Sequence, residues 1–304
     1  MNVLVTGISG YVGSRLARRL GRDGHAVRGL SRNPSRVELD VPVVKGDAVS
    51  GKGLDRALDG IETAYFLIHS MEPSTEGTFS VRERAAAGNF ARSAHAAGVR
   101  RIVYLGGLVP TSGAASEHLS SRLEVENILL AGSPCSVAFR ASIVIGAGSR
   151  SFRFLVRLVE RLPVLAVPAW RTNRTTPIDE RDVIDLLTAA ATNDSVCGQS
   201  LDIGGPDLVT YGELIDRIRH HMLVGRPTIS FRRLTLTPIA SRISALIAGE
   251  EHELIGPLME GLNDDLLPRD NRAAGLLGVK LHSLDAAIER SLREWEETEP
   301  LAAR

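Results

Sequence analysis

The stretch VTGISGYVGSRL, residues 5–16, decides the fold of this chain. It continues an apolar run that predicts a β-strand, and it leads into an amphipathic segment that predicts a helix. Three glycines, Gly7, Gly10 and Gly13, lie in the turn between them and at the head of the helix. Because a strand, a tight glycine turn and a helix form the first unit of many parallel α/β sheets, we expect such a sheet to begin here.

The spacing of the three glycines predicts a loop that binds a dinucleotide. Gly7 allows the tight turn, Gly10 lets the backbone approach a pyrophosphate, and Gly13 permits close packing of the helix. The N-terminus of the helix also attracts the phosphate charge. The alternative is a glycine-rich turn without a ligand, which the combination of strand, spacing and helix disfavours. The residues expected to contact the dinucleotide in this loop are Thr6, Gly7, Ser9, Gly10, Tyr11, Val12 and Gly13.

Short β-branched segments alternate with longer amphipathic segments up to about residue 148. The strands that this alternation predicts are 2–7, 25–32, 41–47, 62–70, 99–108 and 133–146. The helices that it predicts are 11–24, 53–60, 81–98 and 116–130. Near-continuous apolar strands that alternate with helices predict the α/β class, with a doubly wound parallel sheet covered by helices on both faces.

The pattern of segments changes after Gly148. The elements expected there are helices at 149–163 and 179–194, a strand, turn and helix at 199–222, and a helical tail from about 225. Asp179 is a plausible N-cap of the second of these helices. We therefore expect residues 1–148 to form a dinucleotide-binding core. Residues 149–304 should form a smaller, mostly helical C-terminal substrate lobe that completes the sheet edge, although a single integrated domain also fits.

The charges balance, since 36 Lys and Arg against 36 Asp and Glu give a formal net charge of 0. No overall field therefore favours nucleic acid or an anionic membrane surface. No apolar run approaches the ~20 residues that span a bilayer, and the apolar start is too short for a signal peptide. We expect a cytoplasmic protein with a small-molecule substrate, no nucleic acid and no membrane insertion, and we leave open a homodimer or a protein partner. Cys135 and Cys197 are expected to be free thiols in a reducing cytosol.

The end of the second predicted strand bears on which dinucleotide binds. A chain that binds NAD usually has a carboxylate there to hold the ribose hydroxyls. The stretch RGLSRNPSR, residues 28–36, instead contains Arg32 and Arg36 and has no carboxylate before Glu38. Because a guanidinium matches a 2′-phosphate in charge and geometry, we expect NADP(H) rather than NAD(H). The alternative is that both arginines are ordinary solvated side chains.

Two further loops are expected to complete the cofactor site. Asp47 and Ala48 follow the third strand and should lie near the rim of the adenine. Ile68 and His69 end the fourth strand, where the ribose side of the cofactor would lie. An ordinary loop histidine is an equally acceptable interpretation of His69. Asn89, in the middle of a helix, either anchors the loop after the fourth strand or the neighbouring helix, or simply packs between helices.

Several stretches beyond the glycine loop carry a resemblance to a known group of proteins. They are YFLIHSM (65–71), HAAGVRRIVYLGGL (95–108), FRASIVIGAG (139–148), GAGSRSF (146–152), LPVL (162–165) and RTTPI (174–178). With these motifs the chain resembles the extended, atypical short-chain dehydrogenase/reductase superfamily. Within it, the chain is similar to NmrA-like proteins and to the nucleotide-binding accessory subunit of respiratory complex I. The resemblance extends to about residue 225 and implies a Rossmann-like sheet, NAD(P)(H) binding, and a substrate cleft between the carboxyl edge of the sheet and the C-terminal lobe.

The chain departs from the enzymes of this superfamily at their catalytic positions. Active members use a serine after the fifth strand and a Tyr-x-x-x-Lys motif on the next helix. Here Gly106 and Gly107 stand at the serine position, and the helix expected at 116–130 contains no tyrosine and no lysine. His118 and Arg122 occupy the places of the tyrosine and the lysine.

His118 and Arg122 are therefore the candidate catalytic residues. Histidine titrates near neutral pH and can relay a proton to a developing alkoxide. Arginine keeps its proton, so Arg122 offers charge and geometry only, as a partner for the ribose hydroxyls of the cofactor. The alternative is a solvated His118 beside an Arg122 that clamps the ribose or a phosphate.

Two functions fit these residues. The first is an NADPH-dependent oxidoreductase that reduces a carbonyl, a quinone or a conjugated alkene. The second is a non-catalytic NAD(P) redox sensor, or an assembly or regulatory protein of the NmrA-like type, which the missing serine, tyrosine and lysine favour. The residues that would receive an acidic or aromatic substrate, unless they are ordinary solvated side chains, are Arg140, Trp170, Arg171 and Arg174.

Overall fold

A computed structural model of the chain describes residues 1–68, 79–109, 117–161, 165–167, 169–224, 228–230, 264–299 and 301. For residues 79, 117–120, 161, 165–167, 169 and 228–230 it describes the backbone only.

The centre of the molecule is a seven-stranded sheet in which every pair of neighbouring strands is parallel. Its strands, in spatial order, are β11 (Gln199–Ile203), β6 (Val137–Ala141), β5 (Arg101–Gly107), β4 (Thr63–Phe66), β1 (Asn2–Thr6), β2 (Ala26–Ser31) and β3 (Val43–Lys45). The strand order therefore reverses between β1 and β4. This is the Rossmann-like, doubly wound parallel sheet that the sequence predicted, and that prediction is confirmed.

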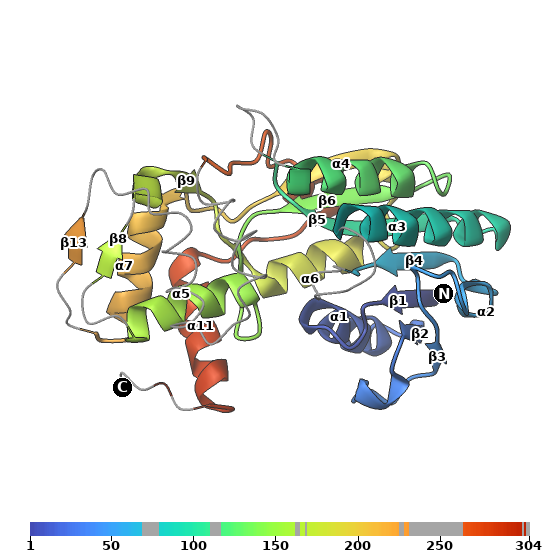
Figure 1. The fold of residues 1–304 in the computed structure, drawn as a ribbon, viewed down its shortest axis with the longest axis horizontal. Helices are drawn as coiled ribbons and strands as arrows, with labels where there is room; N and C mark the ends of the chain where they lie inside the picture. Colours follow the sequence, from blue (N-terminus) through green and yellow to red (C-terminus); the bar gives the residue numbers. More distant parts are fainter. Residues whose placement is uncertain are drawn as a thin grey trace.

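Helices cover both faces of this sheet (Figure 1). One face carries α1 (Tyr11–Arg22) and α6 (Glu180–Ala189), and the other carries α2 (Leu54–Leu58), α3 (Phe79–Ala96) and α4 (Glu117–Leu130). Leu16 and Val183 pack with Val5 in the first of these two cores. Phe90 and Leu129 belong to the second core. Because strands buried on both faces need apolar residues on both, the strand segments are nearly continuous in their apolar character.

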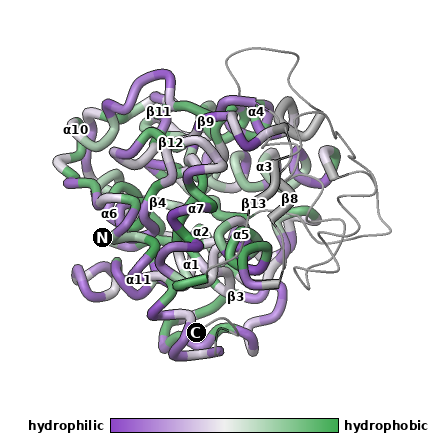
Figure 2. Tube along the Cα trace, turned by 90° about the vertical axis from the view of Figure 1, so that its left-hand side faces the viewer, coloured by the Kyte–Doolittle hydropathy of each residue, from purple (hydrophilic) through white to green (hydrophobic). Residues whose placement is uncertain are grey.

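Helix α1 illustrates how the sequence produces these covering helices. Hydrophilic and hydrophobic residues alternate along it (Figure 2), and the apolar ones, such as Leu16 and Leu20, are the buried ones. The helix gives way to Gly24, which has φ of +82°, a left-handed conformation that favours glycine. The amide of Gly24 donates to the carbonyl of Gly21 at 3.1 Å. The predicted end of this helix at Gly24 is confirmed.

The rest of the chain builds a third hydrophobic core, which includes Phe152, Leu214 and Trp295. It lies mainly between α5 (Arg150–Arg161), α7 (Tyr211–His221) and α11 (Leu284–Glu296). The remaining elements of the described chain are β7 (Val144–Ile145), β8 (Leu165–Val167), β9 (Arg174–Thr175), β10 (Ile178–Asp179), β12 (Val209–Thr210), β13 (Thr228–Ser230), α10 (Ala273–Leu277) and the 3-10 turns η1 (Pro34–Arg36), η2 (Ala169–Thr172) and η3 (Asp194–Val196).

The chain after residue 148 returns to the sheet, since β11 adds its edge strand and α6 covers one face. Asp179 caps α6 by accepting a hydrogen bond from the amide of Arg181 at 2.7 Å, as the sequence predicted. The segment predicted as one strand at 133–146 is instead divided into β6 and β7. The division arises because β7 leaves the sheet and pairs with β10. The domain boundary at 148 stays a prediction.

The expectation of free thiols is wrong. Cys135 and Cys197 form a disulfide, with their Cα atoms 4.5 Å apart. The pairing of β6 with β11 explains this proximity. Val137 pairs with Gln199, and Cys135 and Cys197 each lie two residues before one of these two residues. The sequence separation of 62 residues hid a contact that only the pairing of the two strands creates.

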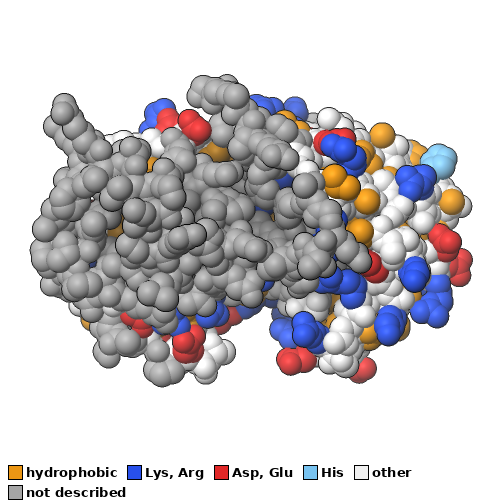
Figure 3. All heavy atoms as spheres, in the orientation of Figure 1, with side chains coloured by type: hydrophobic (Ala, Val, Ile, Leu, Met, Phe, Trp, Pro, Cys, Tyr) orange, Lys and Arg blue, Asp and Glu red, His pale blue; other side chains and the backbone are white. Residues whose placement is uncertain are grey.

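No helix among the described residues is both long enough and apolar enough to cross a membrane. Side chains of both charge signs are interspersed over the described part of the face shown in Figure 3.

Candidate cofactor and active site

The glycine loop joins β1 to α1 in a very tight space. Gly7 has φ of +64°, and a Cβ on it would lie 2.6 Å from the carbonyl oxygen of Leu67 at the end of β4. A Cβ on Gly13 would lie 2.2 Å from the carbonyl oxygen of Gly7. Both distances are far inside van der Waals contact, so only glycine lets α1 begin this close to β1 and β4.

The outer side of the loop is open. Ser9 and Gly10 are exposed, and the amide of Gly10 turns back to donate to the carbonyl of Gly7 at 2.8 Å. Gly10 is also the N-cap of α1, and it has no side chain to cap the first amides of the helix. An uncapped helix N-terminus beside exposed backbone suits an anionic group such as a pyrophosphate.

Other predicted residues of the loop direct their side chains into the protein. The hydroxyl of Thr6 is fully buried, donates to the carbonyl of Tyr65 at 2.9 Å and accepts from the amide of Leu67 at 3.0 Å. Val12 packs against the core on the α1 side of the sheet. Thr6 and Val12 thus hold the loop in place, and contact between these side chains and a cofactor stays a prediction.

The end of β2 carries the predicted NADP-selecting residues. Arg32 and Arg36 are exposed in the segment that follows Ser31, the last residue of β2. The hydroxyl of Ser31 accepts from the amide of Asn33 at 3.2 Å, which turns the chain at this point. Both residues follow the carboxyl end of β2, and the glycine loop follows the carboxyl end of the neighbouring strand β1.

The loop after β3 is held by its own residues and by α3. Asp47 accepts from the amide of Val49 at 3.0 Å, and Ala48 is buried. Asn89 donates to the carbonyls of Ala48 and Val49 at 3.0 and 2.7 Å. Asn89 therefore anchors the loop after the third strand, which neither the anchoring of the fourth-strand loop or neighbouring helix nor simple helix packing had predicted.

Arg122 reaches the carboxyl end of β5. A Cβ on Gly107 would lie 2.7 Å from Nη1 of Arg122, so the guanidinium occupies space that any larger residue would need. The Nε of Arg122 is buried and has no hydrogen-bond partner among the described residues. Burial raises the pKa of Tyr104 on β5, and the neighbouring charge of Arg122 opposes that shift. The place of the missing serine is thus filled by a cation from α4.

The structure describes only the backbone of His118 and does not describe His69. His118 lies in the first turn of α4, one turn before Arg122, and its side chain falls outside the described residues. His69 lies outside the described residues altogether, whereas Ile68 next to it is partly buried at the end of β4. The roles of both histidines stay predictions.

The residues proposed to receive an acidic substrate have other partners. Arg140 is buried and donates to both carboxylate oxygens of Glu126, at 2.8 and 2.6 Å, with Asp202 at 3.5 Å. Arg174 is paired with Asp265 at 2.7 Å. Trp170 packs edge-on against Tyr211 in the third core. Arg171 is exposed.

Comparison with known proteins agrees with this arrangement. A model of a family described as NAD(P)H-binding matches residues 7–127, which include the glycine loop, Gly107 and Arg122. The UDP-glucose 4-epimerase of Thermotoga maritima has the same fold, with a TM-score of 0.75 at 13% identity over 98% of this chain and 99% of the epimerase. The chain thus shares the Rossmann-like fold of this epimerase, and its match to the NAD(P)H-binding family supports the resemblance to the extended, atypical short-chain dehydrogenase/reductase superfamily.

Two relatives are also similar in sequence. A ceramide reductase from Caulobacter vibrioides is 30% identical over 191 residues, which are 62% of this chain and 60% of the relative. A 3-beta-hydroxysteroid dehydrogenase from Mycolicibacterium neoaurum is 34% identical over 113 residues, 34% of this chain and 31% of the relative. The chain therefore spans less than two thirds of the length of either relative. The match to an NAD(P)H-binding family supports a nicotinamide cofactor.

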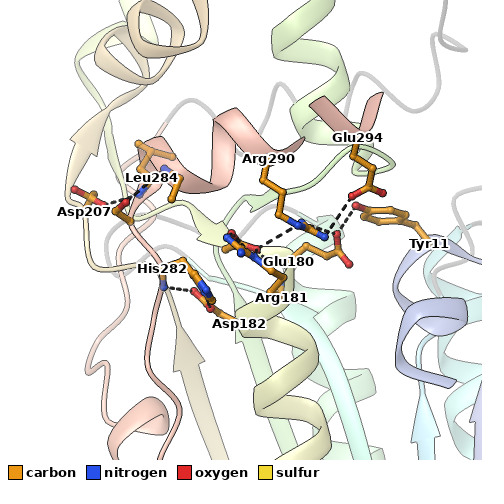
Figure 4. A network of polar contacts seen from close by, with 12 residues as sticks. Tyr11, Glu180, Arg181, Asp182, Asp207, His282, Leu284, Arg290 and Glu294 are labelled. Atoms are coloured by element: carbon orange, nitrogen blue, oxygen red, sulfur yellow. Dashed lines mark hydrogen bonds and ion pairs between the residues drawn. The ribbon is translucent and has the colours of Figure 1, made fainter. Parts of the chain in front are cut away.

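A network of charges that the sequence did not predict joins the start of α1 to α6 and α11 (Figure 4). The hydroxyl of Tyr11 donates to the buried carboxylate of Glu180 at 2.6 Å. Arg15 approaches Glu180 at 3.0 Å and also pairs with Glu294 of α11. Arg290, also of α11, lies 3.6 Å from Glu180. Burial and the charge of Glu180 both raise the pKa of Tyr11.

The same end of α6 also holds the segment before α11. Asp182, which is fully buried, accepts from the amide of His282 at 2.8 Å and contacts the imidazole Nδ1 at 2.5 Å. Asp207 accepts from the amide of Leu284 at 2.8 Å. The sequence offered only the acidic run at the start of a helix, which is also typical of an exposed N-terminus. These contacts fix the start of α11, whereas Arg290 of the same helix connects it to Tyr11 through Glu180.

Proposed function

We propose that the chain is an NADPH-dependent reductase that transfers a hydride to a carbonyl, a quinone or a conjugated alkene. The observation that carries this proposal is the position of Arg122 against Gly107, at the sheet edge from which the glycine loop also emerges. The dinucleotide would lie along this edge, with its pyrophosphate at Gly10 and its nicotinamide ribose near Arg122. The open side of the loop and the unpartnered Nε of Arg122 both fit such a ligand.

The cofactor supplies the hydride when it is bound. An arginine side chain carries a fixed positive charge, so Arg122 contributes that charge and hydrogen bonds to ribose hydroxyls. It does not deliver the proton that completes the reduction. His118, one turn earlier in α4, is the titratable group that we propose for that step, and water is the alternative donor.

The names of the relatives suggest the kind of substrate. One is a ceramide reductase and the other a 3-beta-hydroxysteroid dehydrogenase, so both names refer to lipids. We therefore propose a carbonyl on an apolar molecule as the first substrate class to examine. The substrate would enter between the carboxyl edge of the sheet and the C-terminal lobe.

Preference for NADPH is the second part of the proposal, and it rests on Arg32, Arg36 and the absence of a carboxylate at the end of β2. Replacing both arginines with alanine should weaken NADPH binding by at least about tenfold, which equals about 1.4 kcal/mol, and should leave NADH binding unchanged. Calorimetric titration of both cofactors measures this. Equal losses for NADPH and NADH would assign the arginines to stability or general charge instead.

Activity is tested by NADPH consumption with a sphingolipid ketone, a 3-ketosteroid, a quinone and an enone. We expect turnover with at least one of them, accompanied by one reduced product per NADPH. The variant His118→Ala should then turn over more slowly at unchanged NADPH affinity. Unchanged turnover in this variant would assign the proton to water.

The second candidate is a non-catalytic NAD(P) sensor or assembly protein. It is favoured by Gly106 and Gly107 at the serine position and by the absence of tyrosine from α4. A sensor would bind NADPH tightly and consume none of it with any member of the panel. A cytoplasmic location also belongs to our proposal, and cell fractionation tests it. Size-exclusion chromatography distinguishes a monomer, a homodimer and a complex with another protein.

A further inference from the structure

The disulfide between Cys135 and Cys197 lies at the opposite end of the sheet from the cofactor loop. Each cysteine stands two residues before a strand, so both lie at the amino edge, whereas the glycine loop and Arg122 lie at the carboxyl edge. The five residues of β6 separate the two edges by roughly 16 Å. The cysteines therefore do not belong to the site proposed above.

A buried arginine is directed at both sulfur atoms. Arg101, the first residue of β5, is 1% exposed, and its Nη2 lies 2.9 Å from Sγ of Cys135 and 3.6 Å from Sγ of Cys197. The same nitrogen donates to the carboxylate of Asp194 at 2.6 Å. The other terminal nitrogen donates to the carbonyl of Ala190. Burial lowers the pKa of Arg101 and Asp194 opposes this shift, and an arginine remains charged at neutral pH.

A neutral disulfide gains no charge stabilisation from a neighbouring cation. A thiolate is stabilised, because a positive charge within hydrogen-bond distance of sulfur favours the anion and lowers the pKa of the thiol. We propose that Cys135 and Cys197 form a reversible thiol–disulfide site, in which Arg101 stabilises the thiolate of Cys135 when the bond opens. In a reducing compartment, disulfides are usually transient and serve redox sensing or catalysis, which fits this arrangement.

The exchange is with a small thiol such as glutathione, and exposure decides its order. Cys135 is 5% exposed and Cys197 is more accessible, so the thiolate of the small thiol attacks Sγ of Cys197. The sulfur–sulfur bond breaks, and Cys135 leaves as a thiolate beside Arg101. A second small thiolate then attacks the small-molecule sulfur of the mixed disulfide and releases Cys197. One protein disulfide and two small thiols thus yield two protein thiols and one small disulfide, a transfer of two electrons.

A metal site is the rival interpretation of this cluster. Ligand atoms of Cys135, Asp194 and Cys197 lie within 4.8 Å of one another. However, Arg101 already places a positive charge 2.9 Å from one sulfur and 2.6 Å from the carboxylate. Asp194 also binds Arg100 at 2.6 Å. A divalent cation would have to displace or lie beside these charges, so the cluster favours thiolates over a metal.

Two single variants test the proposal, since the chain contains only these two cysteines. Cys197→Ser isolates the thiol of Cys135, and Cys135→Ser isolates that of Cys197. Thiolate ultraviolet absorbance measured against pH should give Cys135 a pKa below the ordinary thiol value of about 8.5, and lower than that of Cys197. An ordinary or higher pKa for Cys135 would overturn the proposal.

The role of the neighbouring charges is tested on the Cys197→Ser background. Arg101→Gln should raise the pKa of Cys135, whereas Asp194→Asn, which removes a competing anion from a half-exposed position, should lower it further. The second variant keeps the test informative if the first does not fold. No change in the pKa with Asp194→Asn would contradict the role of these charges.

Exchange itself is measured on the unmodified chain in glutathione buffers of graded composition, by alkylation of free thiols and mass spectrometry. We expect reversible conversion between the disulfide and two free thiols. NADPH affinity is measured in parallel on the fully oxidised and the fully reduced chain. A disulfide that resists all glutathione mixtures would overturn the proposal. Stoichiometric zinc binding by the reduced chain would overturn it in favour of the metal site.

Discussion

At the residue scale, the glycine loop is limited by the space at Gly13. A Cβ at this position would lie 2.2 Å from a backbone oxygen, which no side-chain rearrangement can relieve. Gly21 lies in the same helix, is exposed, and has no atom of the described residues within 4 Å of its own Cβ position. Alanine substitutions at Gly13 and Gly21 therefore distinguish the steric effect of a methyl group in the loop from the general effect of replacing a helical glycine.

We predict that Gly13→Ala lowers both the melting temperature and the affinity for NADPH, the latter by at least about tenfold, because α1 must move away from β1. Gly21→Ala should keep NADPH affinity and gain up to about 1 kcal/mol of stability from helix propensity. Thermal unfolding and NADPH fluorescence titration measure the two effects. A Gly13→Ala variant with the melting temperature and affinity of the unmodified chain would show that the loop tolerates a methyl group.

The glycine loop was predictable because its signature is local: three glycines at fixed spacing, directly after an apolar strand and at the start of an amphipathic helix. The partners of Arg140 were not predictable. Glu126 reaches it through the packing of α4 on the sheet, and Asp202 through the register of β6 with β11, and local sequence specifies neither. Thr6 is a similar case, since its hydroxyl bridges to β4 across a pairing that local sequence does not specify.

At the element scale, the start of α7 carries a complete capping box. Thr210 accepts from the amide of Glu213 at 3.1 Å, and Glu213 accepts from the amide of Thr210 at 2.7 Å. These hydrogen bonds, first that from the backbone and then that from the hydroxyl, hold the pKa of Glu213 below its usual range. A glutamate with a lowered pKa stabilises the fold above its unfolded pKa, and this contribution is lost as pH falls through the folded value.

We predict that Thr210→Ala lowers the free energy of unfolding by about 1 kcal/mol at neutral pH, whereas Thr210→Ser retains it. Glu213→Gln should remove the pH-dependent part, so its difference from the unmodified chain shrinks as the pH falls below about 4. Urea unfolding at neutral and acidic pH measures both. A difference that stays constant with pH would show that the charge of Glu213 does not contribute.

Helices and strands were predictable where periodicity alone sets them, as in α1 and the strands of the sheet. The connections at the start of α6 were not. Asp179 was expected as a cap, but the binding of Glu180 to Tyr11 and of Asp182 to His282 depends on how α11 docks. The acidic run DERD predicts the start of a helix, but it does not predict which basic side chains pair with its carboxylates.

At the scale of the whole molecule, the two edges of the sheet carry different chemistry. The carboxyl edge holds the glycine loop and Arg122, and the amino edge holds Cys135, Cys197 and Arg101. The disulfide closes a loop with a sequence separation of 62 residues and ties the edge strand β11 to β6. Cross-links stabilise mainly by restricting the unfolded chain.

We predict that reduction lowers the free energy of unfolding by roughly 2–4 kcal/mol, the usual range for a loop of this size. Urea unfolding with and without dithiothreitol measures the loss. The double variant Cys135→Ser, Cys197→Ser is the matched control, and reductant should not change its unfolding. If the unmodified chain is equally stable with and without reductant, the disulfide contributes nothing to the fold.

We propose that Arg122 serves the cofactor at the position where short-chain dehydrogenases and reductases use lysine. The most direct measurement is kcat/KM and NADPH affinity for Arg122→Ala and Arg122→Lys, with the exposed Arg18→Ala as the control. We predict that Arg122→Ala loses about 10- to 100-fold in kcat/KM, that Arg122→Lys retains part of the activity, and that Arg18→Ala loses none. Equal activity and equal NADPH affinity in Arg122→Ala and the unmodified chain would contradict the claim.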